Sequence, residues 1–417
     1  MTISLTEEKA TAIAEHCKAL VDLDRVKIRA VAQVVGKIIS SLPGVMYGAL
    51  YHRNIELDKT RALRQNAGNF DAYMTLSDGA KKELNWWVRN AQVSYNLISH
   101  GNPDKVLTTD ASLTGWGAVF ENESTGGSWS TAEKTNNINA LELLAVFFGL
   151  KCYAKNANNI HIRIMTDNTT AVSTINHMGT CHSDICNTIG KDIWEWCLAR
   201  SIWISAAHIP GKMNVQADME SRKINSGAEW MLNPTDLQKS LTQLQFTPVI
   251  DLFASRINKQ FVRYASFRPD PEAEIIDAFT IQWGNLKFYM FSPFSVVPAV
   301  LRKIVEDQAM GVCVLPDWPT RAWTNLERHK ISATAKDVIM ASWRESTKKQ
   351  YRTYLTRWEQ FCAERNINWS NATVEQGIDF LANLFEQKLS YSAINTARSA
   401  LSVILTPKDG TSFEKTD

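Results

Sequence analysis

Four acidic side chains in the middle of the sequence have the type and placement expected of a metal-dependent site. Asp110 and Asp167 each end a predicted strand, and Glu142 and Asp218 each lie on a predicted helix. Carboxylates gathered at one edge of a sheet repel one another unless cations neutralise them. Oxygen ligands suit Mg²⁺ or Mn²⁺, and two such ions about 4 Å apart can activate a water for phosphodiester hydrolysis. We therefore predict a two-ion phosphodiesterase site.

The elements that must position these acids begin where the periodicity changes, at residue 105. Alternating apolar residues predict five strands, over 106–111, 115–120, 127–130, 160–166 and 202–206. Helical patterns occupy the intervals after the third strand, over 138–154, 169–177, 183–199 and 212–223. Three consecutive strands followed by helix, strand, helix and strand predict a mixed α/β unit over residues 105–225.

The motifs around the four acids resemble the ribonuclease H domain of retroelement polyproteins. They read Thr109-Asp110-Ala111-Ser112-x-x-Gly115-Trp116-Gly117-Ala118, Asn139-Ala-Leu-Glu142-Leu-Leu-Ala145, Thr166-Asp167-Asn168-x-x-Ala171 and His208-Ile-Pro-Gly211-x-x-Asn214-x-x-Ala217-Asp218-x-x-Ser221-Arg222. The resemblance covers the whole unit, in the same order. It departs at Met219-Glu220, where that family more often has small and apolar residues.

The resemblance implies cleavage of the RNA strand of an RNA–DNA hybrid, a choice that requires reading the 2′-hydroxyls of one strand. By motif, the metal ligands for two Mg²⁺ or Mn²⁺ ions would be Asp110, Glu142, Asp167 and Asp218. His208 would sit on a mobile loop before the last helix and assist proton transfer or product release. Ser112 and Asn168 would lie near the backbone of the hybrid. The alternative is that the acids are caps and solvated loop residues in an inactive relative.

Residues 1–104 are predicted to be helical. Ser4-x-x-Glu7 is a candidate capping box for a first helix over 6–21, Asp24 a candidate cap for the second, and Ser77 precedes the fourth. Leu84, Trp87, Ala91 and Tyr95 share one apolar face of that fourth helix. The runs Ala32-Gln-Val-Val-Gly36-Lys-Ile-Ile and Lys81-Lys-Glu-Leu-Asn-Trp86-Trp87 resemble the thumb or connection part of a reverse transcriptase. No Asp-Asp pair occurs anywhere, so the signature of a polymerase palm is missing.

Residues 226–332 are predicted as a further α/β segment, with strands near 248–253, 286–291 and 311–315. They faintly resemble phage-type adenine-N6 methyltransferases, through Ile250-Asp251-Leu-Phe-Ala254, Asp277-Ala-Phe-x-x-x-Trp283 and Phe291-Ser292-Pro293-Phe294. That family begins its catalytic tetrapeptide with Asn or Asp, whose oxygen accepts from the target amine, and Phe291 stands at that position here. A flipped base would lose its key contact, so we interpret this segment as a structural remnant.

Residues 333–417 are predicted to be helical. The stretch from Ser342-Trp-Arg344 to Trp358-x-x-Phe361-Cys362 resembles the opening helix of the SAM-like, core-binding N-terminal domain of tyrosine recombinases. A basic helix interleaved with aromatic residues suits contacts with the phosphates of double-stranded DNA. The candidate contact residues are Arg344, Lys348, Lys349 and Arg352. The alternative is a solvated helix face. The catalytic Arg, His and Tyr set of a recombinase would lie after residue 417.

Together, these segments resemble part of the Pol polyprotein of a DIRS-like or gypsy-related retrotransposon, whose other Pol domains would be partners. The predicted fold class is α/β multidomain: a ribonuclease H-like mixed five-stranded sheet, flanked by a helical N-terminal segment and a helical SAM-like C-terminal domain. The first functional hypothesis is a ribonuclease of RNA–DNA hybrids. Its rivals are an inactive fragment that binds DNA through its C-terminal domain and a wholly inert product.

Composition excludes several other classes. With 45 basic and 43 acidic residues the net charge is +2, so bulk charge does not drive nucleic-acid wrapping. No apolar run approaches the roughly 20 residues of a membrane helix, and seven scattered cysteines suggest reduced thiols and an intracellular protein. The cluster His177, Cys181, His182 and Cys186 contains no CxxC, so buried thiols are favoured over a zinc site.

Overall fold

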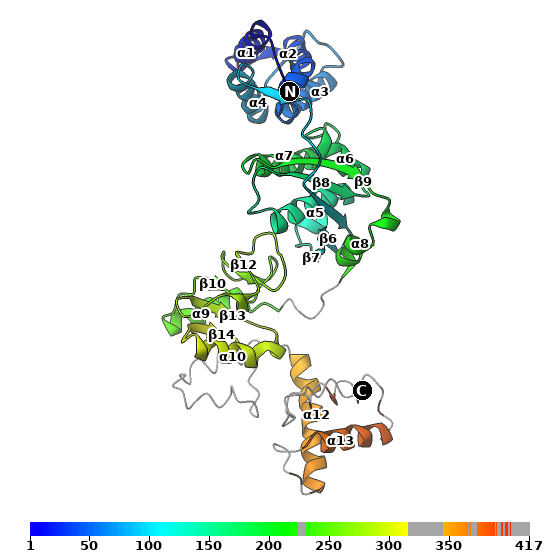
Figure 1. Cartoon of the computed structure of the whole chain (residues 1–417), viewed down its shortest axis with the longest axis vertical. Helices are drawn as coiled ribbons and strands as arrows, with labels where there is room; N and C mark the ends of the chain where they lie inside the picture. The colour runs from blue at the N-terminus through cyan, green and yellow to red at the C-terminus, as the bar shows by residue number, and fades with distance from the viewer. Residues whose placement is uncertain are drawn as a thin grey trace. The chain divides into compact units, whose positions relative to one another are not determined.

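A computed structural model describes residues 1–223, 230–315, 345–365 and 373–387, with the positions 367, 389, 393–394, 397–398 and 401. The chain forms two compact units. The first comprises residues 1–229, 255–257 and 266–276, and the second comprises residues 230–254, 258–265 and 277–417. Figure 1 colours the chain from its N-terminus to its C-terminus. The finer division into four domains stays a prediction.

The N-terminal part of the first unit is helical, as predicted. Its helices are α1 (Glu7–Val21), α2 (Ile28–Ser41), α3 (Arg53–Gln65) and α4 (Asp78–Asn90), with the 3₁₀ turns η1 (Leu42–Gly44) and η2 (Gly48–Tyr51). Four short strands pair antiparallel, β1 (Thr2–Ser4) with β4 (Tyr95–Leu97) and β2 (Val26–Lys27) with β3 (Tyr73–Met74). The helices close around a core that includes Trp87, whose indole N–H donates to the carbonyl of Tyr51 at 2.8 Å.

The cap of α4 was predicted correctly, but three neighbouring details were wrong. Ser77 accepts from the amide of Ala80 at 3.2 Å. Helix α1 is capped by Thr6, not by a Ser4 box, because the chain is still extended at Ser4, within β1. Asp24 caps nothing, because β2 intervenes and α2 starts only after Lys27. Tyr95 is half-exposed on β4 and does not continue the buried face of α4.

A mixed five-stranded sheet dominates the rest of the first unit, which confirms the predicted fold class. Its strands are β5 (Lys105–Ala111), β6 (Gly115–Phe120), β7 (Glu123–Ser128), β8 (His161–Thr166) and β9 (Trp203–His208), in the order β7-β6-β5-β8-β9. The pairs β5–β6 and β6–β7 are antiparallel, and β5–β8 and β8–β9 are parallel. The third strand begins and ends a few residues earlier than predicted, because its partner β6 fixes its register.

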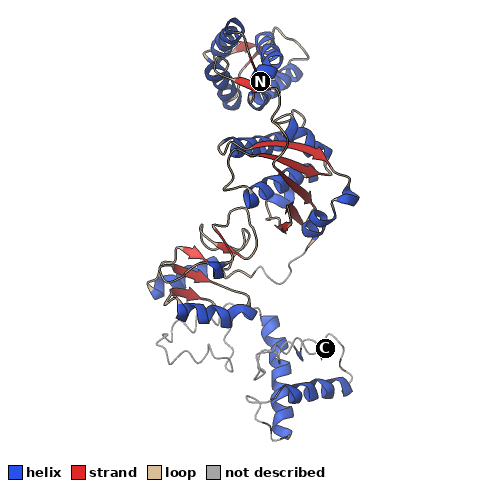
Figure 2. Cartoon of the chain, in the orientation of Figure 1, coloured by secondary structure: helices blue, strands red, loops and turns tan. Residues whose placement is uncertain are grey.

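Helices cover both faces of this sheet (Figure 2). They are α5 (Ile138–Tyr153), α6 (Thr169–Asn176), α7 (Asp184–Leu198) and α8 (Val215–Arg222), with the 3₁₀ turns η3 (Glu133–Thr135) and η4 (Gly211–Met213). Successive residues of a strand face opposite sides of a sheet. Ala118 of β6 contacts α5 near Gly149, whereas Gly117 lies against the backbone of α8 near Ala217. Helices α5 and α8 therefore lie on opposite faces.

The second unit contains a parallel three-stranded sheet, ordered β10-β13-β14. Its strands are β10 (Ile250–Asp251), β13 (Lys287–Met290) and β14 (Met310–Cys313), accompanied by α9 (Pro234–Leu244), α10 (Val297–Glu306) and the 3₁₀ turns η5 (Ala278–Thr280) and η6 (Phe294–Val296). Two further short strands, β11 (Ala265–Ser266) and β12 (Ile275–Ile276), pair with each other, and Ser266 and β12 belong to the first unit. The predicted α/β character of this segment is confirmed.

Helices α12 (Glu345–Glu364) and α13 (Val374–Glu386) form the C-terminal part of the second unit. Trp358 and Phe361 of α12 pack against Phe380 of α13, with ring centroids 5.3 Å apart in each pair. Of the third helix predicted over 392–405, the structure describes only scattered positions. In the described part of the chain, no helix combines the length and apolarity needed to cross a bilayer.

Candidate metal centre

Three of the four predicted acids meet at one point. A carboxylate oxygen from each of Asp110, Glu142 and Asp167 lies within 4.8 Å of the other two. Asp110 and Glu142 are buried, and Asp167 is partly buried. Among the described residues, these three form the group of side chains able to hold a metal ion.

Parallel pairing brings the two aspartates together. Strands β5 and β8 are parallel neighbours, so their carboxyl ends lie side by side at one edge of the sheet. Asp110 is the penultimate residue of β5, and Asp167 follows the last residue of β8. Glu142 reaches the same edge from the N-terminal part of α5, a helix that begins after the Asn137 cap. The three ligands therefore come from three elements far apart in the sequence.

Asp110 is fixed by two residues to which the sequence assigned no role. The Ser221 hydroxyl donates to Asp110 Oδ2 at 2.6 Å. The side-chain Nδ2 of Asn214 donates to the Thr109 carbonyl at 3.0 Å and lies 3.4 Å from Asp110 Oδ1. Ser221 and Asn214 are both buried. Both residues belong to the Asn214-x-x-Ala217-Asp218-x-x-Ser221 motif, so the spacing of this motif could have predicted that they support the site.

Burial and the charges of neighbouring carboxylates raise the pKa values of Asp110 and Glu142. Desolvation, followed by the charges of Asp110 and Asp167, raises the pKa of Glu142 to about 8. Desolvation also raises the pKa of Asp110, against the opposing effect of the Ser221 hydrogen bond. A cluster that resists ionisation by itself is suited to a cation, which would favour the ionised carboxylates. Its all-oxygen donor set fits Mg²⁺ or Mn²⁺.

Asp218, the fourth predicted ligand, lies outside the group of three acids. Its Oδ1 accepts from Arg222 Nε at 2.7 Å, and its side chain is 41% exposed. Asp218 is close enough that its charge contributes to raising the pKa of Asp110. Its role as a metal ligand stays a prediction.

His208 is the last residue of β9, so its predicted placement on a loop was wrong. Pairing with β8 extends the strand two residues beyond the predicted end, and His208 lies opposite Thr166. Thr166 directly precedes Asp167. The imidazole is exposed at the edge of the sheet that carries the acids.

The two residues predicted near the hybrid have structural hydrogen bonds. Ser112 Oγ donates to the Ser221 carbonyl at 2.7 Å and accepts from the amides of Thr114 and Gly115 at 3.1 Å. Asn168 caps α6 through the Ala171 amide at 2.9 Å and donates to Asn139 Oδ1 at 2.9 Å. Contact with a nucleic acid stays a prediction for both residues.

The predicted C-terminal DNA contacts are described only in part. Lys348, Lys349 and Arg352 belong to α12, and Arg344 lies outside the described residues.

In the segment resembling methyltransferases, Phe291 packs against the apolar cluster that contains Leu237 and Tyr289. Asp251 is buried and accepts from the amides of Phe253 and Gln260, at 3.3 and 3.1 Å. Desolvation raises its pKa to about 6.

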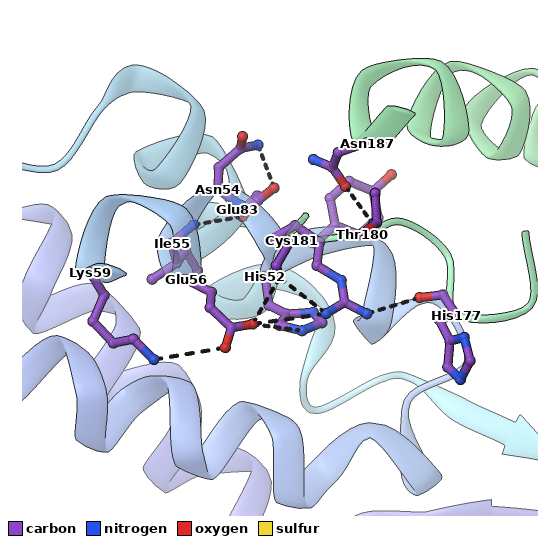
Figure 3. A network of polar contacts seen from close by, with 12 residues as sticks. His52, Asn54, Ile55, Glu56, Lys59, Glu83, His177, Thr180, Cys181 and Asn187 are labelled. Atoms are coloured by element: carbon purple, nitrogen blue, oxygen red, sulfur yellow. Dashed lines mark hydrogen bonds and ion pairs between the residues drawn. The ribbon is translucent and has the colours of Figure 1, made fainter. Parts of the chain in front are cut away.

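The cysteine and histidine cluster does not converge on one point. Cys181 Sγ lies 3.2 Å from Glu56 Oε2 and 3.4 Å from Arg53 Nη1, so it faces α3 (Figure 3). Cys186 is buried in the core of the unit, while His177 and His182 are exposed.

Comparison with known proteins identifies one family within the chain. Residues 339–405 match the N-terminal SAM-like domain of phage integrases. This match confirms the predicted recombinase-type helical domain in that range. Among curated proteins, none matches the sequence.

The solved structures with similarity to the chain include ribonucleases H. RNase H1 from the halophilic archaeon Halobacterium salinarum NRC-1 is 16% identical, over 27% of this chain and 91% of its own, with a TM-score of 0.24. LC11-RNase H1, solved with an RNA/DNA hybrid, is 15% identical over 28% of this chain and 91% of its own, with a TM-score of 0.24. A foamy viral protease-reverse transcriptase, solved with double-stranded DNA, is 11% identical over 50% of this chain and 36% of its own, with a TM-score of 0.20.

Proposed function

We propose that the first unit is a retroelement-derived ribonuclease H that hydrolyses the RNA strand of RNA–DNA hybrids with the help of two Mg²⁺ or Mn²⁺ ions. The observation that carries the proposal is the convergence of Asp110, Glu142 and Asp167 within 4.8 Å from three separate elements. The motif order around these acids supports the choice of substrate. In this proposal the chain is part of a DIRS-like Pol polyprotein.

In the proposed mechanism the chain's own residues hold the reacting groups. Asp110, Glu142 and Asp167 would ligate the cations, and Asp218 would complete the set from α8. Bound divalent cations supply positive charge that activates a water and stabilises the leaving oxygen. Ser221 and Asn214 keep the Asp110 carboxylate in one orientation. His208, exposed at the same edge, would donate a proton from an imidazole nitrogen to the departing 3′ oxygen.

A labelled-hybrid cleavage assay with Mg²⁺ tests this proposal. Asp110→Asn and Asp167→Asn should each lower the rate by roughly a hundredfold or more, as loss of a key electrostatic group does. Asp71→Asn is the matched control, because Asp71 is an exposed aspartate whose ion pair with Arg29 lies in the helical N-terminal part. A wild-type chain that leaves the hybrid uncut, or an Asp110→Asn variant as fast as wild type, would refute the proposal.

The matched family supports a second function, binding of double-stranded DNA through residues 339–405. The full chain should shift duplex DNA on a gel, and Arg344→Ala with Lys348→Ala should weaken binding and lower the salt slope by roughly one per lost phosphate contact. The double control Lys18→Ala with Lys37→Ala removes two exposed cations from α1 and α2. Unchanged binding after both C-terminal substitutions would exclude Arg344 and Lys348 as DNA contacts.

A further inference from the structure

Two short segments that follow the five-stranded sheet in the sequence belong to the same compact unit as that sheet. They are residues 255–257 and 266–276, here called the clamp segments. In sequence they lie within the region that resembles a methyltransferase, for which no active role was predicted. Their contacts within the first unit reach β7, α5 and α8.

The first attachment is a partly buried arginine, Arg256. Both Nη atoms of Arg256 bind the Glu133 carboxylate, at 2.7 and 3.0 Å, and Nη2 also donates to the Ser128 carbonyl at 3.1 Å. The guanidinium lies 4.4 Å from the ring centroid of Phe148. A two-pronged arginine–carboxylate pair is stronger and more directional than a single contact. Because Phe148 belongs to α5, this attachment anchors the helix that carries Glu142.

The second attachment is made at the edge strand of the sheet. Strand β7 is an edge strand, and the buried Thr125 hydroxyl donates to the Pro269 carbonyl at 2.6 Å. Lys155, just after α5, donates to the Ala273 carbonyl at 2.8 Å. An uncovered edge strand is prone to pair with other chains. The clamp segments therefore bind at the edge of the sheet that is open to such pairing.

The third attachment reaches the helix of the candidate site. Arg268 Nη1 lies 3.1 Å from Glu220 Oε2, and the Glu220 side chain is 5% exposed. Ser124 Oγ and Lys223 Nζ each lie 3.4 Å from Glu220 Oε1. A buried carboxylate is tolerated only with such partners. Glu220 is also one of the two residues at which the sequence differs from the ribonuclease H domains of retroelements, which more often have small and apolar residues there.

We propose that Glu220 and Arg268 are positioning residues, through which the clamp segments hold α8 in the orientation that the metal centre needs. Glu220 directly precedes Ser221, whose hydroxyl holds Asp110, and follows Asp218 by two residues. Loss of the Arg268–Glu220 pair releases α8 and, with it, the orientation of the Asp110 carboxylate. The catalytic consequence rests on the proposed nuclease function, but the restraint of α8 does not.

The test compares Arg268→Gln and Glu220→Gln in the full chain with the conservative Arg268→Lys. Two readouts are needed: hydrogen–deuterium exchange of residues 215–222, and hybrid cleavage as a function of Mg²⁺ concentration. Arg268→Gln should speed exchange in α8 and lower kcat by roughly tenfold, the lower end of the effect seen when a ligand's supporting partner is lost. It should also raise the Mg²⁺ concentration for half-maximal activity and leave KM for the hybrid unchanged. Arg268→Lys should restore both readouts.

Arg29→Gln is the matched control, since it breaks an arginine–aspartate pair of 2.9 Å in the helical N-terminal part. Exchange of residues 215–222 in Arg268→Gln that equals wild type would overturn the proposal, as would cleavage with wild-type kcat and Mg²⁺ dependence. If wild type cleaves no hybrid, the nuclease function fails while the exchange readout still decides whether the clamp restrains α8. If Arg268→Gln does not fold, Glu220→Gln replaces it with the same expected results, because that change removes the charge of the other partner of the pair and keeps the size of its side chain.

Discussion

At the scale of single residues, the candidate centre depends on the neighbours of its carboxylates as much as on the carboxylates themselves. Asp110 accepts a hydrogen bond of 2.6 Å from Ser221, and both residues are almost fully buried. A buried carboxylate with a fixed donor keeps one orientation, which a metal ligand requires. Asp218, by contrast, is bound to Arg222 and partly exposed, and would have to exchange that partner to ligate a metal.

We predict that Ser221→Ala lowers the rate of hybrid cleavage by roughly 10- to 100-fold, the range typical for loss of a residue that supports a metal ligand. The physical reason is that Asp110 loses its shortest hydrogen bond and can rotate. The rate should be measured at several Mg²⁺ concentrations, with Ser40→Ala as control, because Ser40 is exposed and its hydroxyl donates to the Lys37 carbonyl within α2. A rate equal to wild type would show that Ser221 does not support the centre.

The identity of the clustered acids could be predicted from the sequence, but their partners could not. A strand-end aspartate is visible because the strand pattern stops beside it, and the parallel order of β5 and β8 places two such ends together. The hydrogen bond from Ser221 crosses 111 positions of sequence, so no local pattern reveals it. The loop placement of His208 was wrong for a related reason: the end of β9 is set by its pairing with β8.

At the scale of elements, the close approach of α8 to β6 explains a glycine in the sheet. A Cβ added to Gly117 would lie 2.1 Å from the Ala217 carbonyl oxygen and 2.8 Å from the Ser221 amide nitrogen. Both atoms are backbone, so neither can move without moving the helix. Gly117 also pairs directly with Asp110 in the β5–β6 ladder. The missing side chain thus lets α8 reach the ligand on the neighbouring strand.

We predict that Gly117→Ala destabilises the first unit by about 1–3 kcal/mol or more, as overpacking does, and also abolishes hybrid cleavage by displacing α8. Gly36→Ala is the matched control. Gly36 is exposed on α2 with nothing within 4 Å of an added Cβ, so the change should stabilise by about 0.5–1 kcal/mol. Urea unfolding and the cleavage assay check both variants. A Gly117→Ala variant with wild-type stability would contradict the close packing.

At the scale of the whole molecule, polar contacts join the helical N-terminal part to the sheet within the first unit. Glu83 of α4 is fully buried and lies 3.6 Å from Lys191 Nζ of α7, while Asn54 and Ile55 of α3 donate to its carboxylate. Figure 3 shows Glu83 beside Asn54 and Ile55, and Glu56 directed toward Cys181. Side-chain contacts therefore join these two parts in addition to the short chain connection after residue 97.

The burial of Glu83 makes the stability of the first unit depend on pH. Desolvation raises the pKa of Glu83 from 4.5 to about 7, against the opposing effects of Lys191 and the donors on α3. A raised pKa means that the folded state binds the proton more tightly than the unfolded state. Its stabilising contribution is therefore complete below pH 4.5 and is lost as the pH rises to about 7. At about 1.4 kcal/mol per pKa unit, the loss is roughly 3 kcal/mol.

We predict that Glu83→Gln removes this decline of stability between pH 4.5 and 7, because an amide has no proton to lose. The free energy of unfolding of wild type and variant should be measured by urea at several pH values across that window. Glu7→Gln, in the exposed first turn of α1, is the control and should keep the wild-type profile. A Glu83→Gln profile that declines as steeply as that of wild type would refute this role for Glu83.

The sequence by itself determined the elements and the candidate ligands, because both depend on local patterns. Strand alternation, helical faces and caps such as Ser77 involve residues a few positions apart, so the five predicted strands are found in the structure, the third of them displaced by a few residues. Only the tertiary structure decided what surrounds the centre. The Ser221–Asp110 bond, the contact of Gly117 with α8 and the Arg268–Glu220 pair join residues 48 or more positions apart. Such contacts exist only once the chain has closed on itself, and they leave no periodic signal in the sequence.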